Sequence, residues 1–513
     1  MAVETAPPPD AFAEVLAERL EAAVNAVVVR HELVLTAPVG KTPAERAGEL
    51  LAQLVGWARL ADDIAWLTLA VVLGRLPSTN EVDEFRWDVA SETPESATTK
   101  MLQRAWRSGS RTTRPLEVVT NAVVVEVDFC ARYDTHTGIM RVVRETVPRW
   151  VAKHRALLVA WAAGPVMRTL SNPETSRVLS YGTHTPAKAD APTADPGSPL
   201  VVPYGTTVLF PDVAVYSQAD AVSALARYSG NVVSWIGYDL IPILSADLRP
   251  SVEVGNPAVT FTAIKYSTRV AGISQSAATE YAGFVDALPA QGIRGPIVRG
   301  VPLPSVGAAL PPGPHANRDK SRPTLLIVGS REKQKNVRAA FHAAEVLWAE
   351  GLDFELRHLG PGGWDDSAFA AVAARMEALK RPFTALGRVS EQRLWDEMRA
   401  ADAVLFFSLH EGYGLPVAEA LSVGTPVVTT NYGSQAEIAA DGGCILVDPR
   451  DDESIAAALR SVITDRDRRE SLVAAAAVRP TRTWDDYAAE TWAFLVNGVE
   501  PFAAQTKGQE VTR

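Results

Sequence analysis

The sequence predicts an α/β protein that begins with a helical region, and three patterns along the chain support this fold class. Up to about Arg114, apolar residues recur at spacings of three and four, which is typical of amphipathic helices. From Leu116 onward, short runs of β-branched residues indicate strands. After Pro323 such runs alternate regularly with helical segments, which indicates βαβ units and therefore a doubly wound parallel sheet.

The composition narrows the class of protein. A chain of 513 residues exceeds one compact domain, and 47 % hydrophobic with 21 % charged residues is the balance of a globular protein. The net charge of −10 argues against a nucleic-acid partner, which calls for a basic surface. Two cysteines exclude a disulfide framework, and the first residues lack the basic and apolar stretches of a secretory signal. We therefore expect a cytoplasmic protein that binds no nucleic acid.

Residues 1–114 form the helical region. Phe12, Leu16 and Leu20 lie on one face of a first helix, and Leu50 and Leu54 lie on one face of a second. The expected role is packing against the rest of the chain or oligomerisation through these helices.

Residues 115–305 contain the first strands. We expect strands at 117–127, 178–181, 207–210 and 232–236. A helix follows Gly138, and Pro148 inside it should kink the helix or start a new one. Segment 183–199 is expected to be an irregular loop, and the proline-rich segment 302–323 to be a linker.

Beyond the linker, strands are expected at 324–328, 354–359, 383–386, 403–407, 427–430 and 445–447. In a doubly wound sheet, ligands bind at the carboxyl ends of the strands. Candidate site residues should therefore lie in the loops that follow these strands.

The densest signal is the segment from residue 408 to 431. Glu411 lies between a predicted strand and a short predicted helix, and Gly412 and Gly414 beside it let backbone N–H groups approach a ligand. The N-terminus of that helix favours an anion such as a diphosphate. Glu419 lies eight residues after Glu411, so both carboxylates can face one pocket. The alternative is an ordinary loop with two solvated glutamates.

The spacing of Glu411 and Glu419, within EGYGLPVAEAL followed by GTPVV, resembles the donor-site signature of family-4 retaining glycosyltransferases of the GT-B fold. This family includes bacterial mannosyl- and rhamnosyltransferases. The resemblance implies two Rossmann-like, doubly wound domains that face a cleft. These are an acceptor-side domain at 115–305 and a nucleotide-sugar-binding domain at 306–483, with a C-terminal helix and tail at 484–513 that pack back on the acceptor domain.

The resemblance also implies the residues that hold the donor. Glu411 with the backbone of 412–415 is expected to bind the sugar, and Glu419 the ribose. Lys335, in a loop that resembles the family's diphosphate loop, and Arg331 are expected to bind the diphosphate, although a lone lysine is often only solvated. The implied catalytic residues are Glu411, Lys335 and Arg331, and the implied donor-binding residues are Gly412, Tyr413, Gly414, Leu415, Glu419, Gly329 and Arg388.

On the acceptor side, the resemblance implies Gly138, Tyr238 and Asp239. Gly138 alternatively belongs to an ordinary turn between a strand and a helix. Tyr238 stands where the family often has a histidine, so its role in this chain stays open. Glu437 resembles a further family element, but with Ser434 it also fits a capping box of its own helix.

The activity that the resemblance implies is a retaining, metal-independent hexosyl transfer. The sugar would move from a nucleotide-diphosphate donor to a hydroxyl of a glycan or lipid-linked acceptor in bacterial polysaccharide assembly. No cofactor is implied, and the scattered histidines and two cysteines predict no metal site. Two alternatives stay open: a GT-B sugar phosphorylase and an inactive GT-B scaffold.

Basic residues gather at two places in this acidic chain: Arg104, Arg107, Arg111 and Arg114, then Arg141, Arg144 and Arg155. One interpretation is a solvated face. The other is peripheral contact with the inner face of the cell membrane, through its anionic surface or the phosphate of a lipid-linked acceptor.

Overall fold

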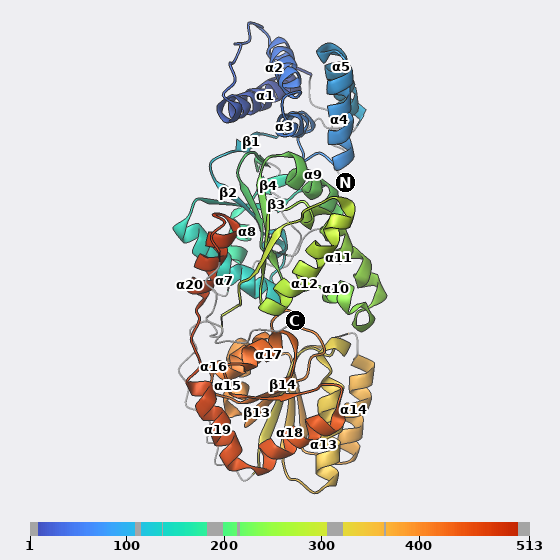
Figure 1. Cartoon of the computed structure of the whole chain (residues 1–513), viewed down its shortest axis with the longest axis vertical. Coiled ribbons are helices and arrows are strands. Elements are labelled where there is room, and N and C mark those ends of the chain that lie inside the picture. Colours follow the sequence, from blue (N-terminus) through green and yellow to red (C-terminus); the bar gives the residue numbers. More distant parts are fainter. Residues whose placement is uncertain are drawn as a thin grey trace.

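Figure 1 shows the computed structural model of the chain, which describes residues 9–107, 114–135, 137–181, 198–212, 216–304, 322–363 and 366–500. Three parts follow one another along its long axis: a group of helices, a first sheet flanked by helices, and a second sheet flanked by helices. We call the first sheet and its helices half A, and the second sheet and its helices half B. The predicted fold class, two α/β parts preceded by helices, is confirmed.

The helical region packs around one apolar helix. Its helices are α1 (Pro9–His31), α2 (Pro43–Trp57), α3 (Asp62–Leu73), α4 (Thr79–Ser91) and α5 (Pro94–Arg107). Every residue of α3 from Asp63 to Leu73 is buried, and the other helices contact it. Trp66 of α3 and Tyr204 and Phe210 of half A belong to one continuous apolar core. The helical region is therefore packed onto half A through a shared core.

Half A is built on a sheet whose described strands follow the order β1-β5-β4-β3-β2-β6-β7-β8-β9. Neighbouring strands are parallel except that β4 is antiparallel to both β3 and β5. The strands are β1 (Leu116–Val119), β2 (Val123–Glu126), β3 (Ala156–Trp161), β4 (Met167–Thr169), β5 (Leu200–Pro203), β6 (Thr207–Phe210), β7 (Val232–Gly237), β8 (Arg269–Gly272) and β9 (Ile297–Gly300). The helices are α6 (Asp128–Arg132), α7 (Gly138–Lys153), α8 (Asn172–Leu179), α9 (Ala219–Tyr228), α10 (Ile241–Leu244), α11 (Ser251–Ile264) and α12 (Gln275–Ala287).

Several expectations for half A are wrong. Segment 117–127 forms two strands, because the chain turns around Asn121, and β1 and β2 are not neighbours in the sheet. Segment 178–181 is not a strand, because a capping box at Ser171 starts α8, which continues to Leu179. No new helix starts at Pro148, because α7 continues through it to Lys153.

The strands predicted at 207–210 and 232–236 are confirmed as β6 and β7. The predicted loop at 183–199 lies mostly outside the described residues, which omit 182–197. The predicted linker at 302–323 likewise lies mostly outside them, because 305–321 are omitted.

Half B has the predicted doubly wound parallel sheet. Its described strands follow the order β12-β11-β10-β13-β14-β15, and every neighbouring pair is parallel. Each strand boundary lies within one residue of its predicted place. The strands are β10 (Thr324–Val328), β11 (Glu355–Leu359), β12 (Phe383–Gly387), β13 (Ala403–Phe406), β14 (Val427–Thr430) and β15 (Cys444–Val447). The helices are α13 (Val337–Ala349), α14 (Asp366–Ala378), α15 (Glu391–Ala400), α16 (Leu415–Ser422), α17 (Gly433–Ala439), α18 (Asp452–Thr464) and α19 (Arg466–Ala477).

The last described helix, α20 (Trp484–Leu495), leaves half B and packs against α7 of half A (Figure 1). The indole N–H of Trp150 donates to the Ala488 carbonyl oxygen over 2.8 Å. The chain thus crosses between the halves twice. The Arg482 guanidinium in the second crossing donates to the Pro302 carbonyl oxygen, 2.9 Å away, so the segment before α20 lies beside the last described residues of half A.

Among the described residues, none of the helices is both long enough and apolar enough to cross a membrane.

Candidate functional site

The loops after β10 and β13 bring two predicted site residues together. These strands are neighbours in the sheet of half B, so the loops at their carboxyl ends meet. The Lys335 ammonium Nζ lies 2.5 Å from Oε1 of Glu411. The two side chains are only 20 % and 11 % exposed, so the ion pair is largely shielded from solvent.

The glycines beside Glu411 serve two different needs. Gly414 precedes α16 with a φ of 103°, a left-handed conformation that favours glycine. A Cβ on Gly412 would lie 2.4 Å from the Tyr238 carbonyl oxygen, so only glycine lets the two loops approach so closely. Because Tyr238 follows β7 of half A, the loops at the carboxyl ends of both sheets meet here.

The predicted acceptor-side residues all lie against the donor loop. A Cβ on Gly138 would lie 3.6 Å from Leu415 Cδ1, and Gly412 also abuts Asp239. Burial raises the pKa of Asp239 to about 6, although its carboxylate accepts a hydrogen bond from the Ile241 N–H. The Tyr238 hydroxyl donates to the Pro211 carbonyl oxygen over 2.6 Å, and desolvation raises its pKa. Tyr238 is thus held by half A itself.

Glu419 forms an ion pair with half A, at the junction of the two halves that we call the cleft. Its Oε1 accepts a hydrogen bond from Nη1 of Arg141, which projects from α7 of half A. The two side chains are 7 % and 10 % exposed. Desolvation raises the pKa of Glu419, and the Arg141 charge opposes this rise.

The structure contradicts the interpretation that Arg141 and Arg144 belong to a solvated basic face. Arg141 and Arg144 are buried, not solvated. The Arg144 guanidinium donates to the Tyr133 and Arg177 carbonyl oxygens, because α7 turns that side chain toward the core. Arg155 is exposed. The side chains of Arg104 and Arg107, and all of Arg111, lie outside the described residues, and Arg114 donates to the Ser198 carbonyl oxygen.

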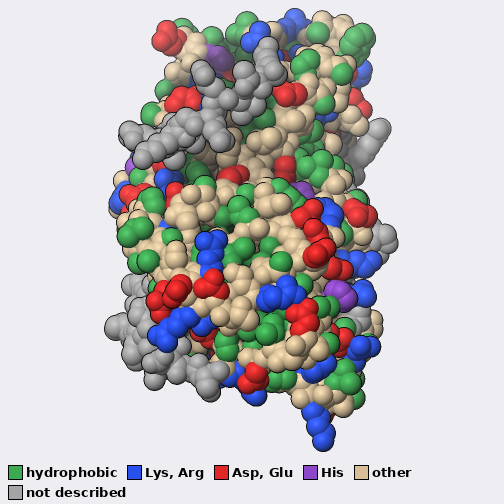
Figure 2. Space-filling view, turned by 60° about the horizontal axis from the view of Figure 1, so that its bottom comes forward, with side chains coloured by type: hydrophobic (Ala, Val, Ile, Leu, Met, Phe, Trp, Pro, Cys, Tyr) green, Lys and Arg blue, Asp and Glu red, His purple; other side chains and the backbone are tan. Residues whose placement is uncertain are grey.

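On the face that Figure 2 shows, outside its grey parts, acidic and basic side chains lie interspersed.

The other predicted donor residues are more dispersed. The Arg331 guanidinium lies over the Phe369 ring, 4.1 Å from its centroid. Arg388 is exposed in the loop after β12. The Tyr413 hydroxyl is buried and donates to the Leu303 carbonyl oxygen over 2.8 Å. Gly329 follows β10, and its carbonyl oxygen lies 3.1 Å from Nε2 of His358.

The capping box predicted for Ser434 and Glu437 is wrong. α17 begins after Tyr432, so Ser434 already lies inside the helix and cannot cap it. The Glu437 carboxylate instead accepts hydrogen bonds from the N–H groups of Gln275 and Ser276, at the start of α12 in half A. Glu437 therefore joins the two halves.

His410 makes a further contact with half A that the sequence does not predict. Its Nε2 lies 2.7 Å from Oε1 of Glu280, and its Nδ1 lies 2.8 Å from the Ser245 hydroxyl. Burial lowers the pKa of His410, but the hydrogen bond and charge of Glu280 outweigh this effect and raise it. The sequence feature that could have pointed to His410 is its position directly before Glu411.

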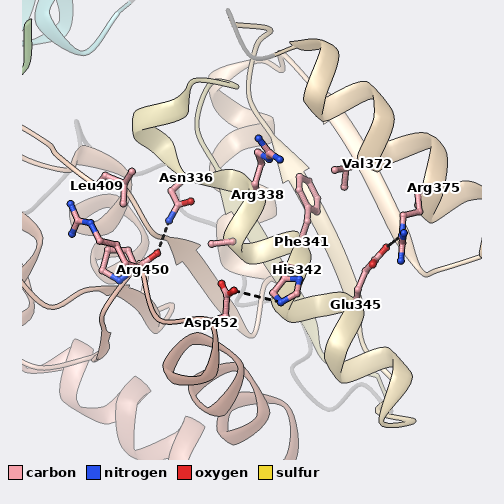
Figure 3. Close-up of a pocket in the computed structure, with 12 residues that line it drawn as sticks. Asn336, Arg338, Phe341, His342, Glu345, Val372, Arg375, Leu409, Arg450 and Asp452 are labelled. Carbon is pink, nitrogen blue, oxygen red and sulfur yellow. Dashed lines mark hydrogen bonds and ion pairs between the residues drawn. The ribbon is translucent and has the colours of Figure 1, made fainter. Parts of the chain in front are cut away.

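A hollow of about 730 Å³ lies against the same two loops (Figure 3). Asn336, next to Lys335, and Leu409, two residues before Glu411, both line it. An ion pair joins two lining residues, Arg375 and Glu345, at 2.8 Å, and Nε2 of His342 lies 3.6 Å from Oδ2 of Asp452. The Asn336 amide donates to the Pro449 carbonyl oxygen.

Within the described part of the chain, no three His, Cys, Asp or Glu side chains are arranged to hold a metal ion.

Comparison with known proteins agrees with this geometry. The family model described as "Glycosyl transferases group 1" matches residues 314–479. The O-antigen chain mannosyltransferase B of Escherichia coli is 30 % identical over 168 residues, 32 % of this chain and 44 % of that protein. The serotype-specific mannosyltransferase WbdA of E. coli is 25 % identical over 341 residues, 62 % of this chain and 39 % of that protein. The glycogen synthase of Mycobacterium tuberculosis is 32 % identical over 172 residues, 33 % of this chain and 41 % of that protein.

The chain thus spans less than half the length of these three relatives. The matched segment contains the loops of Lys335, Glu411 and Glu419, and the two α/β sheets meet at their carboxyl ends as in the GT-B fold. Residues 314–479 of this chain are therefore similar to the glycosyl transferases group 1 family.

Proposed function

We propose that the chain is a retaining glycosyltransferase that moves a hexose from a nucleotide-diphosphate donor to a hydroxyl of a glycan or lipid-linked acceptor. The observation that carries this proposal is the shielded pair of Lys335 and Glu411, held by adjacent loops of half B against Tyr238 and Asp239 of half A. The relatives named as mannosyltransferases support a bacterial polysaccharide as the product.

In this proposal the donor binds in half B. The Lys335 ammonium, now paired with Glu411, binds the diphosphate. At an effective dielectric constant of about 20, one such charge at 4 Å contributes roughly 4 kcal/mol of attraction. The positive end of the α16 dipole, directly after Gly414, favours the same anion. Glu411 then accepts hydrogen bonds from the sugar hydroxyls.

The reaction needs positioning rather than an enzyme nucleophile. The acceptor hydroxyl attacks the anomeric carbon from the side on which the diphosphate leaves, and a leaving diphosphate oxygen takes its proton. The side chains contribute by orienting donor and acceptor and by stabilising the charge that develops on the diphosphate. We propose that Lys335 stabilises this charge without a metal ion.

A ligand screen tests the donor class. We expect one nucleoside diphosphate among UDP, GDP, ADP and dTDP to raise the Tm of the protein, and inorganic phosphate not to do so. A response to phosphate alone would indicate a sugar phosphorylase. No response to any of them would contradict the proposal and favour an inactive scaffold.

Glu411→Gln tests the site. We expect transfer or hydrolysis of the donor to fall at least 100-fold, which corresponds to about 2.7 kcal/mol of transition-state stabilisation. The control is Glu470→Gln, which changes an exposed glutamate on α19 that pairs only with Arg466 among the described residues. Equal rates for wild type and Glu411→Gln would show that the site is assigned wrongly.

A further inference from the structure

The first turns of α7 and α16 lie face to face across the cleft. Gly138 at the start of α7 lies against Leu415 at the start of α16. One turn deeper, at spacings of three and four residues, Arg141 meets Glu419. Successive contacts on one face of each helix fix the position of the Arg141 guanidinium relative to Glu419.

The two oxygens of the Glu419 carboxylate differ. Oε1 accepts the hydrogen bond from Arg141. Oε2 forms no hydrogen bond within the described residues, and it is not one of the buried oxygen atoms that lack a partner. The small exposed part of this side chain is therefore where a hydroxyl donor can reach the carboxylate.

We propose that Arg141 is a positioning residue for the donor ribose: it holds Oε1 of Glu419 across the cleft and leaves Oε2 to the ribose hydroxyls. This inference rests on the proposed function. It means that the nucleotide site of half B is completed by a side chain of half A, so a nucleotide finds its full site only where the two halves meet.

The charges around Glu419 lead to a measurable consequence. Arg141 of α7 and Glu391 at the start of α15 act on it, with opposite signs. Among the described residues, β13, β14, α17 and α19, which also pack against α16, add no further charged group that shifts it. Without Arg141, the desolvated carboxyl takes up a proton at a higher pH and becomes a weaker acceptor for hydroxyl groups.

The test compares nucleotides with and without the ribose hydroxyls. Calorimetry gives the Kd of UDP, GDP or ADP, whichever binds, and of its 2′,3′-dideoxy counterpart, between pH 6 and pH 9. The ratio of the two Kd values cancels the titration of the diphosphate itself. For wild type we expect a constant preference for the ribose form. For Arg141→Met we expect this preference to fall at least tenfold at pH 6 and to recover toward pH 9.

Three further variants separate positioning from folding. Arg141→Lys keeps the charge and should restore most of the preference. Arg149→Met makes the same change further along α7, where the guanidinium pairs with Glu145 and Asp485, and should bind like wild type. On a Glu419→Gln background, Arg141→Met should cause no further loss, because Arg141 acts through Glu419.

The outcomes distinguish this inference from the proposed function. A ribose preference that Arg141→Met leaves unchanged or increases at pH 6 would overturn the positioning role, since an increase would mean that Arg141 competes with the ribose. Failure of wild type to bind any nucleoside diphosphate would overturn the proposed function, and with it this inference.

Discussion

Half A is joined to its neighbours at two ends, and the two junctions differ in what their polar groups can do. At the helical region, the Asp63 carboxylate accepts hydrogen bonds from the Arg30 guanidinium and from the hydroxyl of Tyr204, which belongs to the shared apolar core. None of the predicted site residues takes part. At the cleft, Gly412 and Glu419, which were predicted to bind the donor, themselves contact half A.

Because of this difference, variants at the two junctions should affect different quantities: stability at the helical region and activity at the cleft. At the helical junction, polar groups only hold two parts together, so variants there should change the free energy of unfolding and leave ligand binding intact. At the cleft, the groups that join the halves are also the ones that bind the ligand in the proposed function. Variants at the cleft should therefore change activity more than stability.

Gly412→Ala should have the largest effect on activity among the following variants. The added Cβ would lie 2.4 Å from the Tyr238 carbonyl oxygen, so the donor loop must move away from half A. We expect kcat/KM to fall at least 50-fold. The control is Gly283→Ala on α12, where a Cβ meets nothing within 4 Å and activity should be unchanged. Equal activity of both variants would mean that the loops need not touch.

Asp63→Asn should give the largest loss of stability. Removing the charge leaves the half-buried Arg30 without its ion-pair partner and weakens the bond to Tyr204. We expect the free energy of unfolding to fall by about 2 kcal/mol, with the Kd for nucleotides unchanged. Denaturant unfolding and calorimetry measure the two quantities. Asp62→Asn, at an exposed position one residue earlier, is the control. A change in nucleotide affinity on Asp63→Asn would contradict the prediction that the helical junction affects stability alone.

His410→Gln should have the smallest effect, and one that depends on pH. Because Glu280 raises the pKa of His410 in the folded state, protonated His410 stabilises the protein below its usual pKa of about 6.5. This contribution is lost as the pH rises through the higher folded-state pKa. The Tm difference between wild type and variant should therefore be larger at pH 5.5 than at pH 9. A difference that grows with pH would contradict the assignment.

Much of half B was predictable because its signals are local. Its strands are short segments that alternate regularly with helices along the chain, so the order of elements can be read from the chain. Half A was harder to predict. The turn at Asn121 divides one apparent strand, and the antiparallel β4 pairs with strands that its own residues do not indicate.

The site likewise contains residues that local patterns predict and residues that only the docking of the two halves brings together. Lys335 and Glu411 were singled out from local patterns, and adjacent strands bring them together. The cross-cleft roles of Arg141, Glu437 and His410 depend on partners that lie from 130 to 278 residues away in the chain. No local pattern predicts such contacts, because they depend on how the two sheets dock.

The last described residues of half A before the second sheet are held by two different segments of the chain. The Arg482 guanidinium, just before α20, donates to the carbonyl oxygen of Pro302. The Tyr413 hydroxyl, two residues after Glu411, donates to the carbonyl oxygen of Leu303. The end of half A is therefore anchored both to the loop of Glu411 and to the segment that leads into α20.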